Sequence, residues 1–184
     1  NKMQPPKISI FSNPLVSTWV FDETHRILFD AGDGVSAMLD GKIHRANYLA
    51  LTHSHRDHCA GLMQFLNLRG GAGDFNAIYP VGSGSARTLE TFLTAFDSRS
   101  TSKVRWSQIA AGESFQIAPE RYFLRAFETD HYPFVEGLTN RSLGYQIVRT
   151  VDKLKPEFRS MPQAQVDEIR RAKGRECMLE TIED

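Results

Sequence analysis

A dense cluster of histidines directly after an apolar run limits what this chain can fold into. Residues 47–51 have the composition of a buried strand, and residues 52–58 read Thr-His-Ser-His-Arg-Asp-His. A buried strand would give the loop at its end a rigid base, so that the loop's side chains can converge on one point. Imidazole nitrogen and carboxylate oxygen are ligands that Zn²⁺ prefers. The cluster therefore predicts a metal site, and a solvated polar loop is the alternative.

Short apolar runs bounded by turn residues predict more strands than helices. Helical spacing of apolar residues predicts helices at 61–68 and 83–96, and the second has Leu89, Phe92, Leu93 and Phe96 on one stripe. Strands that come early and then mix with helices favour an α/β architecture with a sheet layered against helices. The expected strands are 7–11, 18–21, 26–30, 47–52, 77–81, 103–106, 114–117, 121–128 and 143–148.

The composition is that of one globular domain. The chain has 184 residues, of which 41% are hydrophobic and 24% charged, so we expect a single domain over 1–184. From residue 150 the sequence becomes charged and contains prolines. We expect 150–184 to be a charged connecting segment without a core strand. It should contain a helix with Pro162 in its first turn and Gly174 just past its end.

Charge and cysteine content bear on partners and compartment. Lys plus Arg and Asp plus Glu both number 22, so nucleic-acid binding would need a local basic patch. Cys59 and Cys177 follow no disulfide or zinc-ribbon spacing, which favours a reducing compartment. The longest early apolar stretch, 8–11, is far shorter than a membrane span of roughly 20 residues. We expect a cytoplasmic protein with no membrane partner.

Several motifs resemble those of one known family. The HSHRDH at 53–58 is similar to the HxHxDH motif of the metallo-β-lactamase superfamily, and the following GL at 61–62 resembles its phosphodiesterase branch, which includes ribonuclease Z. LFDAGDG at 28–34 is similar to the LFDxGEG segment of ribonuclease Z. DH at 130–131 before SLGYQI at 142–147 resembles the family's later motif. The resemblance implies an αββα metallo-β-lactamase fold, with mixed β-sheets sandwiched between helices and an incomplete second half.

The resemblance also implies metal ligands. His53, His55 and His131 would hold one divalent ion, and Asp57 and His58 would help to hold a second, with Zn²⁺ the expected metal. Asp57 is the catalytic candidate, because it would orient or deprotonate a water that two ions about 3.5–4 Å apart activate for in-line attack on a phosphodiester. The family has a later aspartate and a final histidine, whereas this sequence has no histidine after His131. Either the chain is a fragment, which we favour, or those ligands are absent.

Further residues are candidates for supporting roles. By resemblance, Asp30 and Asp33 would support the metal loop without binding metal. The Gly-Ser run that contains Ser83 and Ser85 precedes a predicted helix, where free N–H groups favour anions. These serines could bind a substrate phosphate or could form an ordinary turn and helix cap.

The leading functional hypothesis is a zinc phosphodiesterase or endoribonuclease resembling ribonuclease Z, with RNA as the candidate substrate. One alternative is lactone or thioester hydrolysis on the same fold, and another is a non-catalytic, metal-poor binding module without distal ligands. The family's tRNA-processing members commonly carry an arm with a Gly-Pro-rich tip, and no Gly-Pro pair occurs here. A homodimer is expected only by resemblance.

Overall fold

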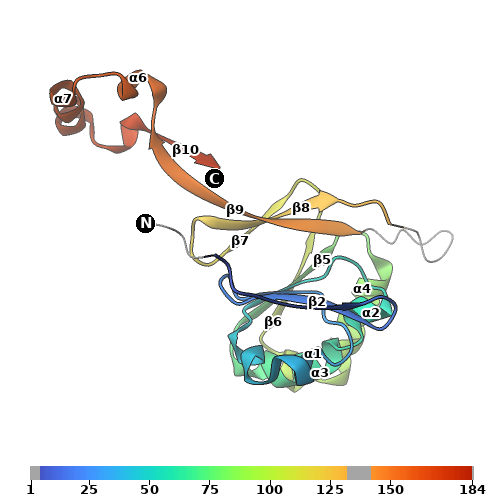
Figure 1. Ribbon diagram of the computed structural model, residues 1–184. Coiled ribbons are helices and arrows are strands. Elements are labelled where there is room, and N and C mark those ends of the chain that lie inside the picture. The colour runs from blue at the N-terminus through green and yellow to red at the C-terminus, as the bar shows by residue number, and fades with distance from the viewer. Residues whose placement is uncertain (1–4, 132–141, 184) are drawn as a thin grey trace. The chain divides into compact units, whose positions relative to one another are not determined.

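The computed structural model describes residues 5–131 and 142–183 and contains two β-sheets (Figure 1). In the six-stranded sheet, the strands lie in chain order, β1-β2-β3-β4-β5-β6. Strands β1, β2 and β3 pair antiparallel, whereas β3 to β6 pair parallel. The predicted α/β architecture is confirmed. The six strands are β1 (Ile8–Asn13), β2 (Ser17–Asp22), β3 (Ile27–Phe29), β4 (Tyr48–Ala50), β5 (Phe75–Pro80) and β6 (Val104–Ile109).

Helices bury apolar side chains against the six-stranded sheet. The longer ones are α3 (Leu62–Arg69) and α4 (Gly84–Phe96), as the sequence predicts. The helical segments α1 (Val35–Leu39), α2 (Arg56–Cys59), α5 (Ser98–Thr101), η1 (Asp40–Arg45) and η2 (Gly70–Ala72) were not expected. Each fully buried Leu or Phe contributes about 1.5–3 kcal/mol. The core includes Phe21, Leu28, Leu49, Val35, Leu39, Leu62, Phe65, Leu66 and Leu93.

The second sheet has four strands in the order β10-β9-β8-β7. They are β7 (Ser114–Ile117), β8 (Tyr122–Glu128), β9 (Leu143–Leu154) and β10 (Leu179–Glu183). The chain divides into two compact units, one of Asn1–Phe115 with Arg125–Gln146 and one of Gln116–Leu124 with Ile147–Asp184. Strands β8 and β9 therefore contribute residues to both units.

The segment 150–184 contains more than the predicted helix. That helix is α7 (Gln163–Lys173), with Pro162 immediately before it and Gly174 as its C-cap. A short helix, α6 (Pro156–Arg159), and a 3-10 turn, η3 (Glu176–Met178), accompany it. The segment also has strand structure that was not expected, because β9 extends to Leu154 and pairs antiparallel with β10, although no residue of β10 is buried. Charged, exposed residues such as Asp152 and Lys153 interrupt the apolar pattern of β9, so a search for apolar runs does not detect this part of the strand.

The carboxyl ends of β3 and β4 provide the base of the candidate site. The two strands pair in parallel register, with Phe29 opposite Ala50, so Asp30 follows one strand and the histidine loop follows the other. The backbone N–H of Asp30 donates to the carbonyl of Ala50 at 3.0 Å, which holds the two strand ends together. Ligands in sheets of this kind bind beyond the carboxyl ends of the strands. Within the described residues, no helix has the length and apolar character needed to cross a membrane.

Candidate metal centre

Three imidazole rings gather around that of His53. Its ring centroid lies 4.7 Å from that of His55, 4.1 Å from that of His58 and 4.4 Å from that of His131. One ligating atom from each of His53, His55 and His131 can be chosen so that all three atoms lie within 4.8 Å of one another. The fold thus brings together residues that are up to 78 positions apart in the sequence.

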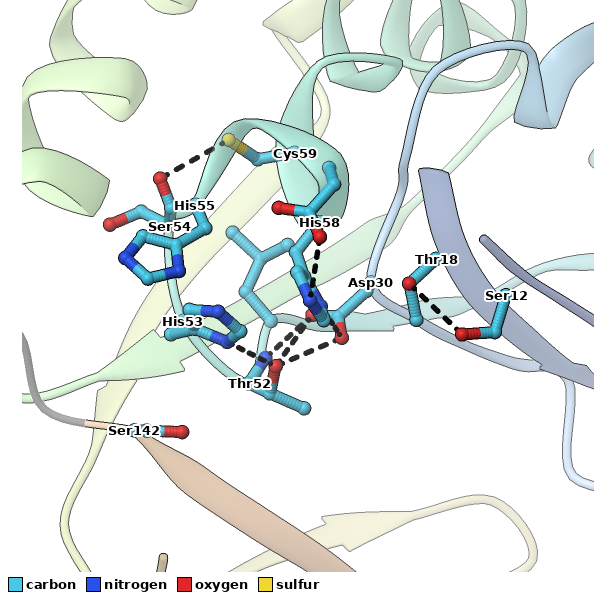
Figure 2. A network of polar contacts seen from close by, with 12 residues as sticks. Ser12, Thr18, Asp30, Thr52, His53, Ser54, His55, His58, Cys59 and Ser142 are labelled. Atoms are coloured by element: carbon cyan, nitrogen blue, oxygen red, sulfur yellow. Dashed lines mark hydrogen bonds and ion pairs between the residues drawn. The ribbon is translucent and has the colours of Figure 1, made fainter. Parts of the chain in front are cut away.

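The hydrogen bonds around His53 fix which nitrogen is available to a ligand (Figure 2). Oγ1 of Thr52 lies 2.9 and 3.1 Å from the two carboxylate oxygens of Asp30, to which it must donate its single proton. The same oxygen, 2.8 Å from Nδ1 of His53, can then only accept from that nitrogen. Nε2 of His53 therefore carries the lone pair. It is buried and has no hydrogen-bond partner among the described residues, which is what a metal-ligating nitrogen requires.

Asp30 orients a second imidazole directly. Nδ1 of His58 donates to the Oδ2 of Asp30 at 2.8 Å, so Nε2 of His58 carries its lone pair. The carboxylate is buried, with 4% of the residue exposed, and it also accepts from the backbone N–H of Thr52 at 2.8 Å. One carboxylate thus sets the tautomers of His53, through Thr52, and of His58. A hydrogen bond from the ring nitrogen that does not bind metal fixes the orientation of an imidazole ligand and raises its basicity.

Asp57 and His58 form a second pair of candidate ligands. Oδ2 of Asp57 lies 3.5 Å from Nε2 of His58, the nitrogen that the bond to Asp30 leaves with its lone pair. The backbone N–H of Leu15, in the turn between β1 and β2, donates to the same Oδ2 at 3.2 Å. This oxygen and the Nε2 of neutral His58 would suit a second cation, for which a proton on His58 competes, because Asp30 raises the pKa of His58.

Two glycines allow the Asp30 segment to pack tightly against α2. A Cβ added to Gly32 would lie 2.4 Å from the carbonyl oxygen of Asp57, and one added to Gly61 would lie 2.2 Å from that of Gly32. Backbone hydrogen bonds join the same segments, from Ala31 N–H to the carbonyl of His58 at 2.7 Å and from Gly61 N–H to that of Ala31 at 2.8 Å. The glycines of both predicted motifs therefore have a steric role.

His131 reaches the cluster because β9 begins beside the histidine loop. The backbone N–H of Leu143 donates to the carbonyl of Thr52 at 2.9 Å, and the hydroxyl of Tyr145 donates to the carbonyl of Leu51 at 2.7 Å. At the end of β8, Thr129 pairs with Ser142 through both backbone and hydroxyl groups. Nε2 of His131, an exposed residue, comes within 3.0 Å of Nδ1 of His55.

The pKa shifts of His53 and His55 favour cation binding, whereas the shift of His58 opposes it. Burial lowers the pKa of His53 to about 3, and the neighbouring histidines add to the effect. Burial, followed by His131, also lowers the pKa of His55. Burial opposes the charged form of His58, but the hydrogen bond and negative charge of Asp30 outweigh it and raise the pKa of His58. At neutral pH, His53 and His55 are neutral and can donate lone pairs to a metal ion.

The other predicted residues differ in position. Asp33 is exposed, its backbone carbonyl accepts from Ser17 at 2.7 Å, and its side chain makes no described bond to the cluster. Ser83 caps α4, because its hydroxyl accepts from the N–H of Ala86 at 3.4 Å. The hydroxyl of Ser85 lies 2.5 Å from that of Ser54, between the first two histidines.

Sequence reasoning missed Thr52 and Tyr145 as parts of the centre. Thr52 has a visible signal, a hydroxyl next to the first histidine of the motif. Tyr145 belongs to the predicted strand 143–148, but its role depends on a contact between residues 94 positions apart.

Comparison with known proteins identifies the class to which this fold and site belong. The family model described as the beta-lactamase superfamily domain matches residues 25–154, which include β3, β4 and every histidine of the cluster. The chain belongs to this superfamily, and the predicted fold family is confirmed.

Curated relatives named ribonuclease Z match part of the chain. Ribonuclease Z of Listeria monocytogenes serotype 4b is 31% identical over 125 residues, which are 66% of this chain and 38% of that protein. The same enzyme of Listeria innocua is 32% identical over 127 residues, with the same coverage. The chain thus spans well under half the length of the curated relatives it matches.

Solved structures share the fold at low identity. YhfI of Bacillus subtilis, a metallo-β-lactamase fold protein, has a TM-score of 0.57 at 11% identity, and the match covers 78% of this chain and 58% of the YhfI chain. The short form of human tRNase Z has a TM-score of 0.51 at 17% identity, covering 81% and 59%. Zn²⁺-bound PqqB of Methylobacterium extorquens has a TM-score of 0.50 at 19% identity, covering 72% and 45%.

Proposed function

We propose that this chain carries the metal-binding core of a zinc-dependent phosphodiesterase that resembles ribonuclease Z and cleaves RNA. The observation that carries the proposal is the convergence of His53, His55 and His131, with the buried Nε2 of His53 left for a ligand by the bond from Nδ1 to Thr52. The curated relatives named ribonuclease Z favour a phosphodiester substrate over other substrates of the superfamily.

The residues present fit two cations of unequal affinity. His53, His55 and His131 would hold the first, and Asp57 with His58 would help to hold the second. A bound ion would supply a Lewis acid and an activated water for in-line attack on phosphorus. Asp57, whose carboxylate lies 3.5 Å from Nε2 of His58 and so beside the second cation, would orient that water and accept its proton. With two ligands from this chain against three, the second ion should bind more weakly.

Metal titration and hydrolysis of bis(p-nitrophenyl) phosphate by the purified chain test the proposal. We expect one tightly bound Zn²⁺ per chain and phosphodiester turnover that a chelator abolishes. Replacing His55 by alanine should remove tight zinc binding and lower turnover by more than about 100-fold, because losing a direct ligand costs more than losing its support. His44, which is exposed and outside the cluster, provides the matched control as His44→Ala.

The alternatives give different results in the same experiment. Faster turnover of a lactone or thioester than of the phosphodiester would assign carbonyl chemistry to the same centre and reject a phosphodiesterase. A chain that binds no zinc tightly would be a non-catalytic module, and the proposal would be wrong.

A further inference from the structure

Helix α4 exposes an aromatic pair to solvent. Phe92 is 50% exposed and Phe96 is 66% exposed, and their rings stack with centroids 5.4 Å apart at 26°. The sequence predicted that both rings would share an apolar stripe with Leu89 and Leu93, but only Leu93 is fully buried. The aromatic pair therefore adds little to the core and is available for contact with a ligand.

An open cavity of about 390 Å³ lies along the same side of α4. Residues four positions apart form one row along a helix, so Gly84, Thr88, Phe92 and Phe96 lie in line. The cavity offers a cation, two threonine hydroxyls and an aromatic ring, and its described lining has no carboxylate. The lining residues are Gly84, Arg87, Thr88, Thr91 and Phe92.

Arg87 gives the cavity a positive charge. It is exposed, and within the described ranges it has no acidic partner. The acid one helical turn further along, Glu90, instead accepts a hydrogen bond from the hydroxyl of Tyr79. An exposed guanidinium without a carboxylate partner favours an anionic ligand, and phosphate oxygens match its fork of donors.

Helix α4 begins beside the histidine loop. The hydroxyl of Ser85, in the first turn of α4, lies 2.5 Å from that of Ser54, which stands between His53 and His55. From Ser85 to Phe92 the helix rises about 10 Å, at about 1.5 Å per residue. This length matches about three stacked nucleotides at about 3.4 Å each.

We propose that this side of α4 is a subsite for single-stranded RNA, with Arg87 contacting a phosphate and a nucleobase stacking on Phe92, which Phe96 backs. The inference rests on the proposed function, since it extends the substrate away from the metal centre. A paired base cannot offer its face to a side chain, so an aromatic platform selects unpaired strands. A nearby cation adds affinity that depends on salt.

Binding of a fluorescein-labelled 12-nucleotide RNA, followed by fluorescence anisotropy with a chelator present, separates this subsite from catalysis. We expect Phe92→Ala and Arg87→Ala each to weaken binding by about tenfold. Arg87→Ala should also lower the slope of log affinity against log salt by about 0.7, the value for one phosphate contact on a single strand. Phe92→Ala should leave that slope unchanged, and Phe92→Trp should restore affinity.

Control variants and a duplex define the opposite outcomes. Met63, on α3, has the same exposed fraction of 50%, so Met63→Ala should bind RNA as the wild type does. Equal binding by Phe92→Ala and the wild type would overturn the subsite, even if phosphodiester hydrolysis is present. Tighter binding of duplex RNA than of single-stranded RNA would also overturn the subsite. The same holds if Phe92→Ala dissociates an oligomer of the chain without changing its affinity for RNA. Retained RNA binding without hydrolysis would instead reject the catalytic proposal alone.

Discussion

Removing the carboxylate of Asp30 should destabilise the fold and weaken metal binding together. In Asp30→Ala, the N–H and hydroxyl of Thr52 and the Nδ1–H of His58 lose their acceptor. Hydrogen bonds to charged groups contribute about 1.5–3 kcal/mol each, and breaking a buried ionic pair costs about 3–5 kcal/mol. Residue 30 also has φ of 56°, a left-handed conformation that costs alanine about 1–2 kcal/mol. Since these effects overlap, we expect the free energy of unfolding to fall by about 4 kcal/mol.

Asp30→Asn separates the charge from the geometry. Asparagine adopts left-handed backbone conformations readily and keeps an oxygen for Thr52, so the loss of stability should be only about 1–2 kcal/mol. Its neutral amide supports the tautomers of His53 and His58 less firmly, so zinc affinity should fall by about 10- to 100-fold. A 10- to 100-fold loss corresponds to about 1.4–2.7 kcal/mol, so we expect the charge to contribute to zinc affinity at least as much as to stability.

Urea unfolding in the presence of a chelator, followed by tryptophan fluorescence, measures stability for the wild type and both variants. Trp19 is 4% exposed and reports loss of the core. Competition with a chromophoric chelator measures zinc affinity. An Asp30→Ala variant within about 0.5 kcal/mol of the wild type would refute the network described here, since that is the range of neutral surface changes. Unchanged zinc affinity in Asp30→Asn would refute the role of the charge.

Two further predictions concern packing around the centre. Gly61→Ala should lower the free energy of unfolding by more than about 3 kcal/mol, because the new Cβ would lie 2.2 Å from the carbonyl oxygen of Gly32. Gly41→Ala is the control in the same urea experiment and should be neutral, because its Cβ would have no atom within 4 Å. Tyr145→Phe should cost about 1–2 kcal/mol, because the carbonyl of Leu51 loses its hydroxyl donor; an unchanged unfolding midpoint would show that the bond does not stabilise the start of β9.

The sequence predicted the parts of the centre that depend on short-range order. His53, His55 and His58 lie within six positions of one another just after the buried strand β4, so the strand prediction alone brings them to one sheet end. The position of His131 could be predicted only by resemblance, because it depends on the contact of Leu143 with Thr52, residues that spacing cannot pair. Long-range strand contacts leave no local periodicity in the sequence.

Asp30 and Asp33 show that a shared motif does not distinguish the roles of its individual residues. Both belong to the segment 28–34, and the resemblance gave them the same supporting role. The structure separates them, since Asp30 directly follows β3 and is buried, whereas Asp33 is exposed one turn later. The difference arises from the parallel register of β3 with β4, which directs the first carboxylate towards Thr52.

The contacts of the cluster differ in how firmly they hold each histidine. Asp30 and Thr52 hold His53 and His58 through hydrogen bonds that need no metal, and burial keeps His53 neutral. His131 is exposed, and its described contacts with the cluster are with the rings of His53 and His55. A cation would therefore meet lone pairs that hydrogen bonds already orient on the loop after β4, whereas the described bonds of Asp30 and Thr52 do not reach His131. The affinity for the first ion then contains the cost of ordering His131, and tighter anchoring of β9 should increase that affinity.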